Sequence, residues 1–134
     1  MRILVVDDDD CCRFMLRDAL ATIIPRERIS FASDGDEGWW VLTDPERTFD
    51  LLILDLAMPR VNGLALLARI RQHPKLVNLP IILCTGTSTR QTVTEAVRHN
   101  VISYVVKPFS PAAIVQKVEE VMLQINGAKA ALVK

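Results

Sequence analysis

Acidic side chains are concentrated near the start of the chain, where Asp7, Asp8, Asp9 and Asp10 follow the apolar run ILVV at residues 3–6. Neighbouring carboxylates repel one another, and a carboxylate that is partly buried also loses hydration. Such a cluster is therefore unfavourable unless a cation lies beside it. The sequence indicates a cation site at this position.

Further reactive side chains stand at the ends of other apolar runs: Asp55 after LLIL, Thr85 just past IIL and Lys107 after YVV. Asp7, Asp8 and Asp55 together offer the oxygen ligands that suit Mg²⁺. A carboxylate such as Asp55 can attack phosphorus as a nucleophile and form an acyl phosphate. A metal ion, a lysine and a hydroxyl would stabilise the charge of the transferred phosphoryl group. These residue types fit phosphoryl transfer.

The same apolar runs predict the elements that must position these side chains. Continuous apolarity at 3–6, 51–54, 81–83 and 104–106, with a weaker run at 29–33, is typical of parallel strands covered on both faces. Apolar residues at helical spacing lie between the runs and after the last one. Five strand–helix units predict an open, doubly wound α/β sheet. Ligands of such sheets bind beyond the carboxyl ends of the strands, so we expect the polar strand ends to share one crevice.

Capping residues mark two helix boundaries. Asp9 and Asp10 favour the start of the first helix, where carboxylates cap free amides and complement the helix dipole. Ser110 before Pro111 predicts the start of the last helix, and Gly127 is expected to end it.

The 134 residues, half of them hydrophobic, predict one domain over residues 1–126 with a short tail at 127–134. Sixteen basic and sixteen acidic residues give no net charge, which argues against direct nucleic-acid binding. No apolar run approaches a membrane span and the first residues lack the basic-then-apolar layout of a signal peptide, so we expect a cytoplasmic protein without membrane contact. The three cysteines are expected to be reduced, with Cys84 buried.

Four sequence motifs resemble those of the receiver domain of two-component response regulators. They are VVDD at 5–8, LILDLAMPRVNG at 52–63, the Thr-Gly of LCTGT at 83–87 and YVVKPF at 104–109, with Asp55, Thr85 and Lys107 spaced 30 and 22 residues apart. The resemblance extends from about residue 2 to residue 126. It implies a flavodoxin-like (βα)5 fold with a five-stranded parallel sheet in the order 2-1-3-4-5.

The resemblance also implies a role for each site residue. Asp55 accepts a phosphoryl group from a histidine kinase or phosphotransfer protein, and the chain is a signalling phosphoacceptor rather than an enzyme. Mg²⁺ is bound by Asp8, Asp55 and the backbone carbonyl of Ala57, and by Asp7 through water. Lys107 pairs with the phosphate, and the peptide bond between Lys107 and Pro108 is cis, a form that proline tolerates.

The same resemblance implies a switch that changes the surface of the fourth helix, fifth strand and fifth helix. Thr85 moves onto the phosphoryl oxygens and Tyr104 rotates inward behind it. Contacts with a downstream protein are expected at Arg90, Thr94, Arg98 and Tyr104. The chain is expected to act as a monomer or as a phosphorylation-dependent dimer. If it is the whole protein, it is a stand-alone regulator whose output passes through another protein; a piece of a longer regulator would have the same sequence.

Other classes of protein are less compatible with these motifs. A phosphatase with an aspartyl nucleophile needs a second carboxylate two residues after Asp55, where Ala57 stands. A flavin-binding electron carrier needs a phosphate-binding loop where the four aspartates lie. A receiver-like module that acts without phosphorylation remains an alternative, although all five acceptor-site positions carry competent residues.

Slow self-dephosphorylation is predicted because Ala57 has no side chain with which to orient a hydrolytic water. We expect the substitution Ala57→Asn to shorten the half-life of the phosphorylated form, measured by intact mass after removal of the phosphoryl donor. A half-life that shortens little or not at all would contradict this explanation.

Overall fold

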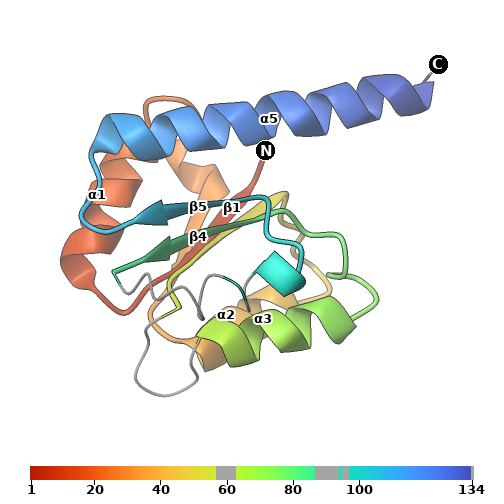
Figure 1. The fold of residues 1–134 in the computed structure, drawn as a ribbon, viewed down its shortest axis with the longest axis horizontal. Helices are drawn as coiled ribbons and strands as arrows, with labels where there is room; N and C mark the ends of the chain where they lie inside the picture. Colours follow the sequence, from red (N-terminus) through yellow and green to blue (C-terminus); the bar gives the residue numbers. More distant parts are fainter. Residues whose placement is uncertain (57–62, 87–93, 95–96, 134) are drawn as a thin grey trace.

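The computed structural model describes residues 1–56, 63–86, 94 and 97–133, which build a parallel sheet between two layers of helices (Figure 1). The strands are β1 (Ile3–Val6), β2 (Ile29–Ala32), β3 (Leu51–Leu54), β4 (Ile81–Thr85) and β5 (Ser103–Val106). All neighbours pair in parallel, in the order β2-β1-β3-β4-β5. The predicted fold is confirmed, because each apolar run of the sequence contributes a strand.

Helices lie on both faces of this sheet. They are α1 (Asp10–Leu20), α2 (Gly35–Leu42), α3 (Gly63–Gln72) and α5 (Pro111–Val133), with a short 3-10 helix, η1 (Arg26–Arg28), before β2. Figure 1 shows α1 and α5 on one face and α2 and α3 on the other. Between β4 and β5, residues 94, 97 and 98 are helical, and the rest of the predicted fourth helix lies outside the described residues. Within the described ranges, no helix is long and apolar enough to cross a membrane.

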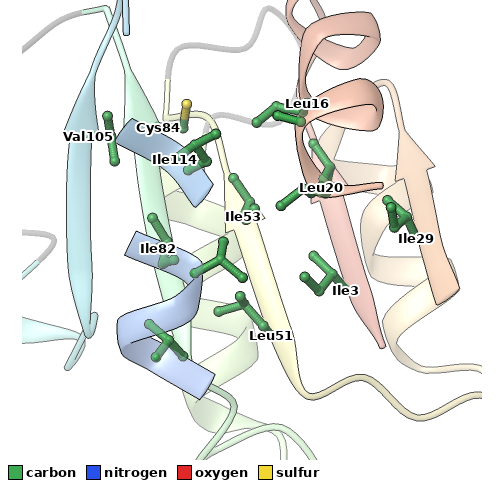
Figure 2. Close-up of a cluster of buried hydrophobic side chains, with 14 of the residues drawn as sticks. Ile3, Leu16, Leu20, Ile29, Leu51, Ile53, Ile82, Cys84, Val105 and Ile114 are labelled. Carbon is green, nitrogen blue, oxygen red and sulfur yellow. The ribbon is translucent and has the colours of Figure 1, made fainter. Parts of the chain in front are cut away.

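Alternate residues of each strand point to opposite faces, so the sheet has two hydrophobic cores. In β1, Ile3 and Val5 pack under α1 and α5, whereas Leu4 and Val6 pack against α2 and α3. Figure 2 shows the first core, with Ile3, Leu51, Ile53 and Ile82 of the strands close to Leu16, Leu20 and Ile114 of the helices. Burial on both faces explains why these strands are continuously apolar.

Asp9 caps the start of α1, as its position in the sequence predicted. Its carboxylate accepts hydrogen bonds from the backbone amides of Cys11 (2.9 Å) and Cys12 (3.4 Å). Asp10 lies in the first turn, where its negative charge is favourable, and pairs with Arg13. These two carboxylates therefore belong to the helix, which leaves Asp7 and Asp8 for the site.

The expected end of the last helix at Gly127 is wrong, because α5 continues to Val133. Glycine ends a helix when it adopts a positive φ, and no described glycine does so. The residues after Gly127 are mostly alanine, lysine and leucine, which favour helix and offset its low propensity. Figure 1 shows the end of α5 extending past the rest of the domain. The division between residues 1–126 and 127–134 stays a prediction.

Gly63 stands where a side chain has no room, at the start of α3. A Cβ at this position would lie 2.5 Å from both the carbonyl oxygen of Asp55 and the Cα of Leu56. The Gly63 amide also donates a hydrogen bond to the Leu56 carbonyl at 3.0 Å. Glycine therefore lets α3 begin against the backbone that carries Asp55.

We expect Gly63→Ala to lower the free energy of unfolding by about 1–3 kcal/mol, because the added methyl group forces the backbone apart. Gly127→Ala is the matched control: nothing lies within 4 Å of its Cβ position. In this exposed helical setting alanine should raise stability by up to about 1 kcal/mol. Urea denaturation measures the free energy of unfolding of both variants. Equal changes in the two variants would contradict the packing argument.

Candidate functional site

The carboxyl ends of the central strands bring the predicted acidic residues together. Asp7 and Asp8 follow β1, and Asp55 follows β3, the strand hydrogen-bonded to β1. One carboxylate oxygen from each of the three lies within 4.8 Å of the other two. Asp7 and Asp55 are buried, with 1% and 4% of their surfaces exposed, whereas Asp8 is exposed. The site is therefore a partly buried triad of carboxylates that is open on one side.

Lys107 joins the two buried carboxylates. Its Nζ atom lies 2.8 Å from Oδ2 of Asp7 and 3.3 Å from Oδ2 of Asp55. Lys107 follows β5, two strands away from β3, so only the assembled sheet brings it to this position. The ammonium group offsets part of the negative charge that would otherwise make the burial of two carboxylates costly.

The pKa of Lys107 reflects this environment. Burial by itself would lower the pKa, but the hydrogen bond to Asp7 and the charges of Asp7 and Asp55 outweigh burial and raise it above the ordinary value. Lys107 therefore stays protonated through the physiological pH range.

Backbone hydrogen bonds fix both buried carboxylates to the sheet. The amide of Asp7 donates to the carbonyl of Ala32 at 3.1 Å, and the amide of Asp55 donates to that of Val6 at 2.9 Å. Oδ1 of Asp7 also accepts a hydrogen bond from the amide of Asp9 at 2.9 Å. The carboxylates are held before any ligand binds.

Arg13 is a site-adjacent residue that the sequence interpretation missed. From the first turns of α1, its guanidinium donates hydrogen bonds to the carbonyl of Asp7 and to the carboxylate of Asp10. The signal in the sequence was a basic residue three positions after Asp10, a spacing that places two side chains on one helix face. Arg13 ties α1 to the loop that carries the acidic pair.

The charge and ligand types of the triad fit a divalent cation. Three carboxylates and one ammonium leave a net charge of about −2, which an ion such as Mg²⁺ would balance. Carboxylate oxygens are hard ligands, and the exposed Asp8 leaves the site accessible to water, which Mg²⁺ commonly retains.

The structure describes only some of the other residues predicted for the site and its surface. Thr85 is the last residue of β4, in register with Val106, and its side chain lies outside the described part of the chain. Ala57 and Arg90 also lie outside the described residues. Thr94 and Arg98 are exposed, as is Tyr104 on β5, with 47% of its surface accessible. The Lys107–Pro108 peptide bond is cis, as predicted.

Fold and site together define a class of protein: a doubly wound α/β domain with a carboxylate triad and a lysine at the carboxyl ends of its strands. Ligand sites of such sheets lie at this edge. The family model of the response regulator receiver domain matches residues 3–119. The chain belongs to this family, so it is a phosphoacceptor-type signalling domain.

Known proteins are similar to the chain in sequence or in fold. A chemotaxis protein CheY homolog of Campylobacter jejuni is 35% identical over 131 residues, which cover 98% of this chain and 99% of the relative. The signal receiver domain of an HD domain-containing protein from Pseudomonas fluorescens has a similar fold, with a TM-score of 0.83, 24% identity and coverage of 94% and 97%. The Mn²⁺-bound form of response regulator Rcp1 aligns with a TM-score of 0.71 at 23% identity, covering 89% of each chain.

Removing the positive charge of Lys107 should lower the stability of the folded protein. We expect Lys107→Met to lower the free energy of unfolding at pH 7 by about 1.5–3 kcal/mol, because two buried carboxylates lose a charged hydrogen-bond donor. Since the pKa of Lys107 is raised, its contribution is complete below its unfolded pKa of about 10.4 and is lost as pH rises through the folded value.

Urea denaturation at a series of pH values measures this difference. The deficit of Lys107→Met should be constant up to about pH 10 and should shrink at higher pH, where the lysine loses its proton. Lys117→Met is the control, since Lys117 has no ion pair among the described side chains. An equal loss of stability in both variants would contradict the assigned role.

Proposed function

We propose that Asp55 accepts a phosphoryl group from the phosphohistidine of a histidine kinase or histidine phosphotransfer protein. The supporting observation is the contact of Lys107 with both Asp7 and Asp55 inside a carboxylate triad that keeps net negative charge. Asp55 is one of the two buried carboxylates at the ends of the central strands, and Lys107 Nζ lies 3.3 Å from its Oδ2. The proposed setting is the cytoplasm.

In the proposed reaction, a carboxylate oxygen of Asp55 attacks phosphorus while the bond between phosphorus and the donor nitrogen breaks. The imidazole leaves, and Asp55 becomes an acyl phosphate. Lys107 moves from the carboxylate oxygen to an oxygen of the phosphoryl group, where its positive charge offsets the added negative charge. The hydroxyl of Thr85 provides a further donor from the end of β4. The protein assists its own modification and is not otherwise an enzyme.

Mg²⁺ is the proposed cofactor, held by Asp8, Asp55 and the backbone carbonyl of Ala57, and by Asp7 through water. When bound, Mg²⁺ draws negative charge from the phosphoryl oxygens and so stabilises the transition state. The net charge of the triad supports this assignment, as does the likeness in fold to response regulator Rcp1, whose structure is that of a Mn²⁺-bound form. Ala57 lies outside the described residues, so its part in the ligand set rests on the family motif.

The proposed output is a change of the surface near β5 and α5. Thr85 ends β4, beside Val106, and Tyr104 lies on the neighbouring strand in register with Leu83. A movement of Thr85 toward a phosphoryl group would open space into which the exposed ring of Tyr104 can turn. Arg90, Thr94, Arg98 and Tyr104 are the proposed contacts of a downstream protein.

Intact mass spectrometry tests the acceptor assignment. Incubation with Mg²⁺ and a small acyl-phosphate donor should add one phosphoryl group, and either Asp55→Asn or a chelator should abolish the gain. Asp36→Asn is the matched control, because Asp36 is an exposed carboxylate of α2 and should leave the gain unchanged. Absence of a gain in the unaltered protein, or its persistence in Asp55→Asn, would overturn the proposal.

A further inference from the structure

Two cysteines that are far apart in sequence meet behind the phosphoryl site. Cys12 lies in the first turn of α1, and Cys84 lies on β4, directly before Thr85. Both are buried in the core under α1 and α5, and the Cys12 side chain is the largest cause of the raised pKa of the Cys84 thiol, as expected of neighbouring thiols. Figure 2 shows Cys84 on this face of the sheet, close to Ile114.

Of the two cysteines, Cys12 can be reached from a surface cavity. Cys12 lines a cavity of about 360 Å³ between the start of α1 and the segment after β5. The cavity is also bordered by Cys11, Lys107 and Phe109. A molecule as small as a peroxide can therefore reach Cys12, whereas Cys84 is covered, with 1% of its surface exposed.

We propose that Cys12 and Cys84 are an oxidisable pair, a modification site distinct from Asp55, that forms an intramolecular disulfide when a peroxide enters this cavity. Cys12 loses its thiol proton and attacks one oxygen of hydrogen peroxide, the oxygen–oxygen bond breaks, and a sulfenic acid and hydroxide are formed; the hydroxide takes up the released proton and becomes water. The thiol of Cys84 then attacks the sulfur of Cys12, and the second oxygen leaves as water. Two thiols are oxidised and one peroxide is reduced.

Cys84 is the slower partner of this reaction. The contact with Cys12 and burial both raise the pKa of the Cys84 thiol, so it stays protonated at neutral pH. A protonated thiol is a weak nucleophile. Closure of the disulfide should therefore be slower than oxidation of Cys12.

The disulfide should affect the phosphoryl site because each cysteine is next to a part of it. Thiols in contact lie roughly 3.5–4 Å apart, whereas a sulfur–sulfur bond is about 2 Å long. We expect bond formation to draw the start of α1 toward the end of β4, or the reverse. The first shift moves the loop that carries Asp7 and Asp8, and the second moves the backbone of Thr85.

Peptide mapping of the full chain tests the disulfide itself. The protein is treated with hydrogen peroxide, free thiols are alkylated, and trypsin releases residues 3–13 with Cys11 and Cys12, and residues 76–90 with Cys84. We expect these two peptides to be linked through Cys12, with the link lost in Cys12→Ala and Cys84→Ala and kept in Cys11→Ser. No linked peptide, or a link through the exposed Cys11, would overturn the proposal. Mapping of the unaltered chain decides the result even if a variant fails to fold.

The rate of phosphorylation by a small acyl phosphate tests the coupling, which rests on the proposed function of Asp55. We expect the oxidised protein to react roughly threefold or more slowly than the reduced one, because a displacement near 1 Å is costly in a reacting site. A reducing thiol should restore the rate, and peroxide should not slow Cys12→Ala. An unchanged rate would overturn the coupling. If neither form is phosphorylated, the proposed function fails, while the mapping still decides the disulfide.

Discussion

The ion pairs of Lys107 with Asp7 and Asp55 are the interaction on which this site depends. Two carboxylates lie in the protein interior at the ends of adjacent strands, where like charge and lost hydration both oppose their ionisation. One ammonium group reaches both of them and offsets part of that cost. The balance is incomplete, because Asp8 adds a third carboxylate. A site that keeps excess negative charge favours a divalent cation.

The fold supports this arrangement by holding the charged residues on rigid elements. Backbone hydrogen bonds attach Asp7 to β2 and Asp55 to β1, and Gly63 lets α3 begin directly against the Asp55 backbone. The two cores on either side of the sheet fix the strands, so the carboxylates need little adjustment when a ligand binds. Arg13 adds a link from α1 to the same loop. The site is thus organised before any ligand binds.

The cavity beside Cys12 places a second type of chemistry next to the first. The carboxylate triad and Lys107 follow β1, β3 and β5, whereas the two thiols for which oxidation is proposed lie on α1 and β4. Cys12 and Lys107 border the same cavity. The buried position of Cys12, which any small hydrophobic residue could fill, therefore lies next to the proposed phosphoryl site.

The sequence by itself determined the strands, the fold class and the acidic site. Strands buried on both faces must be continuously apolar, and parallel strands must end at one edge, so the residues after ILVV, LLIL and YVV were predictable as neighbours. Asp9 was predictable as a helix cap because capping is a local interaction. Local rules failed at Gly127, where the helical preference of the following residues outweighed a single glycine.

Only the tertiary structure decided the contacts between residues far apart in the chain. The distances from Lys107 to its two carboxylates depend on how the strands pair in the sheet. The link of Arg13 to the Asp7 carbonyl and the proximity of Cys12 to Cys84 depend on how α1 packs on it. A sequence pattern shows which face of an element is buried, but the partner of a buried side chain depends on the packing of the whole domain.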